Sequence, residues 1–189
     1  DVKAFGDTYQ ILVKSQGIQA DGFLNAADAL DEGFGPVDET NIPWETDSPI
    51  KGSAVRNALH YLNADPNGKA ITANVKNVTF GLKKDHAGIV DKYSGTLIDV
   101  DQDIPAEAYY VPNNGGYDIY ILSNDVIYAP VDSSTLFKDM AALQTVDARN
   151  LDTSRAENFL DLFRNCTSLT TVNATGWDTS KINTLRNAF

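Results

Sequence analysis

The sequence comprises 189 residues, of which 42% are hydrophobic and 22% charged, so its composition is that of a globular protein rather than a disordered one. Its net charge of −11 and the lack of a basic stripe argue against nucleic acids and anionic membrane surfaces as partners. A single cysteine, Cys166, excludes an intrachain disulfide and a cysteine-based zinc cluster. No apolar run approaches the roughly 20 residues of a membrane span, so no membrane insertion by this fragment is expected.

Residues 1–68 form the first of three predicted segments, an N-terminal α/β segment of unknown type. The stretch TYQILVK (8–14) predicts a strand, while FLNAADAL (23–30) and SAVRNALHYL (53–62) predict two short helices. The second helix is amphipathic, and its expected buried face consists of Val55, Ala58, Leu59 and Leu62. An acidic loop rich in glycine and proline (31–49) separates the two helices.

Residues 69–135 predict a β-rich cap that leads into the rest of the chain. In KAITANVKNVTFGL (69–82) the alternation of apolar residues changes phase between Val75 and Val78, which suits a β-bulge. The tetrapeptide NNGG (113–116) separates two apolar runs and is a strong hairpin signal. We therefore expect a small antiparallel sheet in this segment.

Residues 136–189 contain a sequence repeat with a period of 26 residues. Residues 136–161 align with 162–187 without a gap, and nine positions are identical. The first copies of these positions are Leu136, Phe137, Leu143, Thr145, Val146, Ala148, Asp152, Thr153 and Ser154. Two complete repeats are thus present, and Ala188 opens a third.

Each repeat shows two different periodicities. Leu143, Val146 and Ala148 have the spacing of a short strand with buried alternate residues. The residues that follow Asp-Thr-Ser have helical spacing: Ala156, Phe159, Leu160 and Phe163. Asp, Thr and Ser are residues that cap helices, so each repeat predicts a strand–turn–helix unit. Such units stack and share one core.

The repeats resemble the BspA-like leucine-rich repeats of bacterial surface proteins, in their mycoplasma-type, 26-residue form. The matching residues are Ser133, Ser134, Leu136, Phe137, Asp152 to Ser154, Phe163, Cys166, Ser168, Leu169 and Trp177 to Ser180. The resemblance covers about the last third of the chain and departs from the family pattern at Met140 and Arg186. Together with the β-rich pattern of residues 69–135, it predicts an α+β fold, in which a mixed N-terminal region with a small antiparallel β-sheet caps a C-terminal leucine-rich-repeat solenoid of strand-turn-helix units.

The resemblance also implies a function. Family members are non-catalytic, extracellular proteins of the cell surface that take part in adhesion, so we expect a host or matrix protein or a glycan as partner. The signal peptide and the anchor would lie outside this fragment, and more repeats would follow it. The candidate binding residues are those that lie between the buried strand positions: Gln144, Thr145, Asp147, Thr170, Thr171 and Asn173. Their spacing alone predicts only an exposed polar strip.

Two other functions stay open at this point. The repeats could be a structural spacer, with binding or anchoring by residues 1–130. The chain could also be a carbohydrate-active enzyme that uses Asp38, Glu39 and Glu45, because glycoside hydrolysis needs only two carboxylates. We assign no catalytic residue and no cofactor, since neither His60 nor His86 belongs to a catalytic motif.

No metal ligand is assigned either. Three alternating carboxylates, Asp99, Asp101 and Asp103, suggest calcium, yet the EF-hand pattern fails because Ile104 occupies the glycine position and Tyr110 the glutamate position. Whether these aspartates bind calcium stays open.

Overall fold

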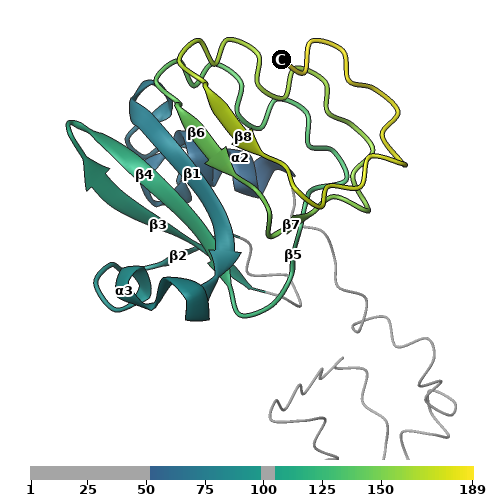
Figure 1. Cartoon of the computed structure of the whole chain (residues 1–189). Coiled ribbons are helices and arrows are strands. Elements are labelled where there is room, and N and C mark those ends of the chain that lie inside the picture. Colours follow the sequence, from purple (N-terminus) through teal and green to yellow (C-terminus); the bar gives the residue numbers. More distant parts are fainter. Residues whose placement is uncertain (1–51, 99–104) are drawn as a thin grey trace, which may run out of the picture. The chain divides into compact units, whose positions relative to one another are not determined.

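The computed structural model describes residues 52–98 and 105–189, which lie within the unit Thr46–Phe189 (Figure 1). The predicted strand at 8–14 and helix at 23–30 lie outside the described residues. So do the carboxylates considered for catalysis, Asp38, Glu39 and Glu45, and those considered for calcium, Asp99, Asp101 and Asp103.

The described residues form a small α+β domain around a mixed sheet of six strands. The strand order is β2-β3-β4-β1-β6-β8, and β5 pairs separately with β7. The neighbouring strands β4, β1, β6 and β8 are parallel, with β8 at the edge of the sheet, whereas β3 and β2 run antiparallel to their neighbours. The strands are β1 (Val75–Leu82), β2 (Thr96–Leu97), β3 (Ala106–Asn113), β4 (Gly116–Ser123), β5 (Ile127–Tyr128), β6 (Thr145–Asp147), β7 (Leu151–Asp152) and β8 (Thr171–Asn173). The helices are α2 (Gly52–His60) and α3 (Ala87–Val90), with short 3-10 turns at Leu62–Ala64, Thr72–Asn74 and Lys83–His86.

Helix α2 confirms the prediction of an amphipathic helix in this part of the chain. Val55, Ala58 and Leu59 are fully buried in the domain core. In Figure 1 the helix lies behind the sheet, so it covers one face only. Tyr110 of β3 ties the helix to the sheet, because its hydroxyl donates to the carbonyl oxygen of Ala58 over 3.0 Å.

Two local predictions for the sheet are confirmed. Asn113 pairs with Gly116, which leaves a two-residue β-hairpin turn at Asn114 and Gly115. Both turn residues have positive φ, 44° and 81°, as a type I′ turn requires. A β-bulge also interrupts the register of β1 between Val75 and Asn77.

The prediction of a leucine-rich-repeat solenoid of strand-turn-helix units is wrong. The predicted small antiparallel sheet is instead part of a mixed sheet, in which β3 and β4 are antiparallel but β1 and β4 are parallel. The described α-helices, α2 and α3, both precede the repeats, and residues 153–164 form turns and irregular backbone. A helix would need the backbone N–H groups for bonds within the segment. Instead, the N–H groups of three residues donate to carbonyl oxygens about one period later in the chain: Phe159 to Thr184, Asp161 to Arg186 and Phe163 to Ala188.

The backbone conformation repeats with the sequence. Positive φ occurs at Thr135, Asp161 and Asn187 (59°, 54° and 52°) and at Asp139 and Asn165 (67° and 63°). Members of each set lie one period apart along the chain. A left-handed residue at these positions breaks any helix, and Asp and Asn are the non-glycine residues that adopt this conformation most readily. The second repeat therefore lies on the first in register.

One core joins the sheet to the repeats. The ring of Phe80 in β1 meets that of Phe137 edge-on at 6.4 Å, and Phe137 stacks on Phe163 at 4.8 Å. All three side chains are buried, together with Val146 of β6. The repeats thus complete the core that β1 and α2 begin.

Candidate functional site: the polar face of the sheet

Four parallel strands present a polar surface on the face away from the core. The surface, called the polar face below, consists of Asn77 and Thr79 (β1), Asp118 and Tyr120 (β4), Thr145 and Asp147 (β6), and Thr171 and Asn173 (β8). Strand register aligns these residues in two rows. The first row is Asp118, Asn77, Thr145 and Thr171, and the second is Tyr120, Thr79, Asp147 and Asn173.

The polar face is unusual for parallel strands. Val78, Ile119 and Val146 alternate with the polar residues and are buried on the other side of the sheet. Parallel strands in proteins are mostly buried on both faces and are apolar throughout. Here Thr171 is exposed and the other seven residues of the polar face are half-buried, so this side is available for contacts.

Hydrogen bonds hold the first row in a fixed arrangement. Nδ2 of Asn77 donates to Oδ1 of Asp118 over 2.7 Å, and Oγ1 of Thr145 donates to Oδ1 of Asn77 over 2.6 Å. Asn113 donates to both carboxylate oxygens of Asp118, each over 3.0 Å. A ligand would therefore meet side chains whose orientations are already set.

Asp147 and Asn173 are neighbours in the second row and occupy the same position in the two repeats. The side chain of each accepts hydrogen bonds from the residue two places later in the chain. Arg149 donates two hydrogen bonds to the Asp147 carboxylate, from Nε to Oδ1 over 2.9 Å and from Nη2 to Oδ2 over 2.7 Å. These hydrogen bonds lower the pKa of Asp147, which stays ionised at neutral pH. One repeat later, Oδ1 of Asn173 accepts from the backbone N–H and the hydroxyl of Thr175, at 3.3 and 2.8 Å. No partner for Nδ2 of Asn173 or for the Thr171 hydroxyl lies in the described part of the chain.

Tyr120, the first residue of the second row, packs against His86. The rings of Tyr120 and His86 lie 5.5 Å apart at an angle of 59°. Gly81 of β1 makes room for this pair, because a Cβ atom there would lie 2.6 Å from Nε2 of His86. Burial raises the pKa of Tyr120, so its hydroxyl is neutral.

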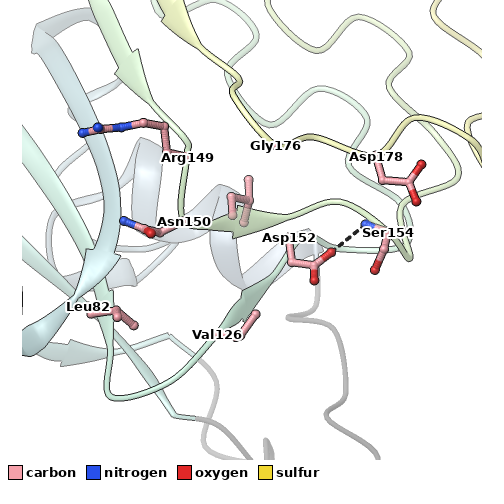
Figure 2. Close-up of a pocket in the computed structure, with 9 residues that line it drawn as sticks. Leu82, Val126, Arg149, Asn150, Asp152, Ser154, Gly176 and Asp178 are labelled. Carbon is pink, nitrogen blue, oxygen red and sulfur yellow. Dashed lines mark hydrogen bonds between the residues drawn. The ribbon is translucent and has the colours of Figure 1, made fainter.

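A pocket of about 430 Å³ adjoins the polar face at the carboxyl ends of β1, β6 and β8 (Figure 2). It is lined by Leu82, Val126, Arg149, Asn150, Leu151, Asp152, Ser154, Gly176 and Asp178. Oδ1 of Asp152 accepts from the backbone N–H of Ser154 over 2.8 Å, and Asp178 does the same with Ser180. The Asp-Thr-Ser motif therefore forms a turn, not the predicted helix cap. Figure 2 shows Arg149 extending toward β1, apart from the two carboxylates.

The only cysteine of the chain, Cys166, has a structural role. Burial raises the pKa of its thiol to about 11, so the thiol stays protonated at neutral pH. Its Sγ donates to the carbonyl oxygen of Phe137 over 2.8 Å. This arrangement is that of a packed side chain rather than a nucleophile.

The structure brings four of the six predicted binding residues together on the polar face: Thr145, Asp147, Thr171 and Asn173. Gln144 and Thr170 instead lie just before β6 and β8. There the N–H and hydroxyl of Thr170 donate to the carbonyl oxygen of Gln144, at 2.9 and 3.1 Å. The other four members of the polar face, Asn77, Thr79, Asp118 and Tyr120, were not predicted from the sequence. Their alternation with apolar neighbours signals an outward orientation, but nothing local shows which strands they join.

Comparison of the chain with protein-family models, with curated protein sequences and with solved structures gives no match. The resemblance to BspA-like repeats therefore stays a prediction. Within residues 52–98 and 105–189, no helix has the length and apolar character needed to cross a membrane.

Proposed function

We propose that the chain is a non-catalytic interaction module that binds a glycan on its polar face. The observation that carries this proposal is the open polar side of four parallel strands, where amide, hydroxyl and carboxylate groups stand in two registered rows. The sequence resemblance adds the setting, an extracellular bacterial surface engaged in adhesion.

The chemistry of the polar face favours a glycan over a protein. Stable protein interfaces have an apolar or aromatic centre with few charges. The polar face has one aromatic side chain, Tyr120, at its end, and donors and acceptors elsewhere. Sugar hydroxyls both donate and accept, and the amide of Asn173 and the hydroxyl of Thr171, which have no partner among the described residues, match that requirement. The repeats carry 6 acidic and 6 basic residues, so hydrogen bonding rather than electrostatic attraction would govern binding.

The test is a glycan array with the full chain, followed by calorimetry on the glycans that bind. The double variant Thr171→Val/Asn173→Asp removes one hydroxyl and one amide donor, yet the carboxylate that it introduces keeps the acceptor that Thr175 uses. We expect its affinity to fall about tenfold, equivalent to about 1.4 kcal/mol. Ser168→Ala is the matched control, because Ser168 is an exposed residue of the same repeat outside the polar face.

Two results would contradict the proposal. Full affinity in the double variant would place the glycan elsewhere, and the adjoining pocket would then be the next region to mutate. Binding to matrix proteins with no glycan bound would show that the ligand is a protein.

A further inference from the structure

The pocket of Figure 2 lies at a break in the layer that precedes the first repeat. This layer consists of β1 and β5, because β1 pairs with β6 and β5 pairs with β7. In the first repeat, residues 148–150 join β6 directly to β7, whereas the chain between β1 and β5 runs away through β2, β3 and β4. The corner at 148–150 is covered on one side by the second repeat, where Nε1 of Trp177 donates to the carbonyl oxygen of Ala148 over 3.0 Å. On its other side this corner faces the pocket.

The same place is a switch point in the order of the strands. From β1 the chain continues to β2, β3 and β4 on one side, and from β6 it continues to β8 on the other. Ligands of sheets with parallel strands commonly bind beyond the carboxyl ends of two such neighbours, where the connections diverge. Leu82 ends β1, Arg149 lies two residues after β6, and both line the pocket. Its volume of about 430 Å³ is in the range of small-molecule sites.

One part of the pocket lining is apolar and partly exposed. Val126 is 40% exposed and Leu82 is half-buried, and both lie beside the buried Leu151 in the lining. Asn150 spans part of the break, since its Nδ2 donates to the carbonyl oxygen of Phe80 over 3.4 Å. An organic group placed over Leu82 and Val126 would therefore remove apolar surface from water.

Two carboxylates, Asp152 and Asp178, form the acidic part of the lining and occupy the same position in the two repeats. The hydrogen bond from the backbone N–H of Ser180 lowers the pKa of Asp178, with a smaller contribution from Lys181, so this carboxyl is ionised at neutral pH. Neither carboxylate forms a salt bridge within residues 52–98 and 105–189. The cation of the lining, Arg149, is already bound to Asp147 outside the pocket.

We propose that this pocket binds a small organic cation, namely a protonated amine that carries an aliphatic or aromatic group. The ammonium group lies at Asp152 and Asp178, and the apolar group lies over Leu82 and Val126. An ammonium has three donors, so it can bond to both carboxylates. The net charge of −11 attracts such a ligand to the chain. The site is separate from the polar face, and this inference does not depend on the proposed glycan binding.

A metal ion fits the pocket less well than an organic cation. Calcium takes six to eight oxygen ligands, and the lining supplies two carboxylates. In the described part of the chain, no three His, Cys, Asp or Glu side chains gather at a place that could hold a metal ion. The apolar side chains beside the carboxylates also have no role with a bare ion.

The test is an NMR titration of the full chain with three compounds of similar size: phenethylamine, 2-phenylethanol and phenylacetate. They carry a cation, a neutral hydroxyl and an anion on the same apolar group. We expect phenethylamine to shift the amide signals of Val126, Asn150 and Gly176 and to bind about tenfold more tightly than the alcohol. Phenylacetate should cause no shift. Methylammonium lacks the apolar group, so it should bind about tenfold more weakly than phenethylamine.

A charge-removing variant locates the amine. The double variant Asp152→Asn/Asp178→Asn removes both charges and keeps the Oδ1 acceptors that the N–H groups of Ser154 and Ser180 use, so the turns are retained. We expect its affinity for phenethylamine to fall about tenfold. Glu157→Gln is the matched control and should bind like the parent chain, because Glu157 is an exposed carboxylate of the first repeat outside the pocket.

Three outcomes would overturn the inference. Equal affinities for phenethylamine and 2-phenylethanol would show that the pocket does not select a cation. Full affinity in the double variant would place the amine elsewhere on this acidic chain. Unshifted signals of Val126, Asn150 and Gly176 with every compound would show that the pocket holds no small organic ligand.

Discussion

Nδ2 of Asn187 donates a 3.1 Å hydrogen bond to Oδ1 of Asp161, the residue one period of 26 earlier. The pairs Asn158–Asp132 and Asn165–Asp139 make the same bond at the same separation, at 3.0 and 2.6 Å. These side-chain bonds and the shared left-handed residues fix how one repeat lies on the next.

Thr135 is the unfavourable member of its left-handed set. Its φ is 59°, but it is β-branched, whereas its counterparts are Asp161 and Asn187. Replacing it with asparagine, which accepts this conformation more readily, should raise the free energy of unfolding by about 1 kcal/mol in urea titrations. Thr135→Val is the control and should not stabilise the protein, since it stays β-branched. An asparagine variant no more stable than the parent would contradict the assignment of strain to this residue.

Phe137, Phe163 and Phe189 stack on one another, and replacing the second or the third with alanine should change the stability by different amounts. Phe163→Ala removes a buried ring between two others and should cost about 3–5 kcal/mol of unfolding free energy. Phe189→Ala removes a largely exposed ring, so its cost should stay within about 0.5 kcal/mol. Chemical denaturation of both variants checks the contrast. Equal costs would mean that Phe189 is covered in solution.

Buried His60 predicts a loss of stability in mild acid. Its Nε2 lies 3.0 Å from the carbonyl oxygen of Leu136, so this nitrogen carries the proton of the neutral ring, and Nδ1 accepts from the Thr72 hydroxyl at 3.0 Å. Burial lowers the pKa of His60 below its ordinary value of 6.5, and the nearby cation Arg56 adds to this.

The unfolded chain therefore binds more protons than the folded one below pH 6.5. The free energy of unfolding should be constant with respect to His60 above this pH and should fall as the pH drops from 6.5 toward the lower pKa of the folded state. Urea titrations between pH 7.5 and about 5 measure the slope. His60→Gln should flatten it, and an unchanged slope in that variant would assign the effect to other groups.

Gly81 and His86 should be energetically coupled. Gly81→Ala places a methyl group within 2.6 Å of the His86 ring and 3.3 Å of Leu122, and this overpacking should cost about 1–3 kcal/mol. In the background of His86→Ala the same change should cost less, because the obstructing ring is absent. A double-mutant cycle measures the coupling. Additive effects would show that the ring moves aside freely.

A chain that ends at Ser134 should not fold. It lacks β6 and the buried residues Phe137, Met140 and Leu143, which belong to the same core as β1 and α2. We expect no cooperative thermal transition by circular dichroism and poor dispersion of amide signals. A folded, cooperative product would instead support the interpretation of the repeats as a dispensable spacer.

The features predicted from the sequence are those that local interactions decide. Helix α2 follows from its apolar stripe, and the β3–β4 hairpin from the Asn-Gly pair at its turn. The repeat predicted β6 and β8, but its apolar spacing from Ala156 to Phe163 was interpreted as helical. Ala156, Phe159 and Phe163 are buried, whereas Leu160 is half-buried. The N–H groups of Phe159 and Phe163 donate to residues about one period later in the chain, so this burial does not depend on a helix.

The candidate site was only half predictable for a related reason. Thr145 and Thr171 follow from the repeat itself, since they are the same position in two copies. Asn77 lies 68 residues before Thr145, to which it is hydrogen-bonded, and parallel pairing over such a distance leaves no trace in either local sequence.

The central position of β1 has a consequence for how the chain is made. β1 pairs with β4 and with β6, and the contacts of Asn77 span 41 and 68 residues. During synthesis at about 5–20 residues per second, the second neighbour of β1 leaves the ribosome roughly 3–14 s after the strand itself. For that time one edge of β1 has no neighbouring strand. A chaperone that binds exposed apolar strands would therefore be expected to bind β1 during synthesis.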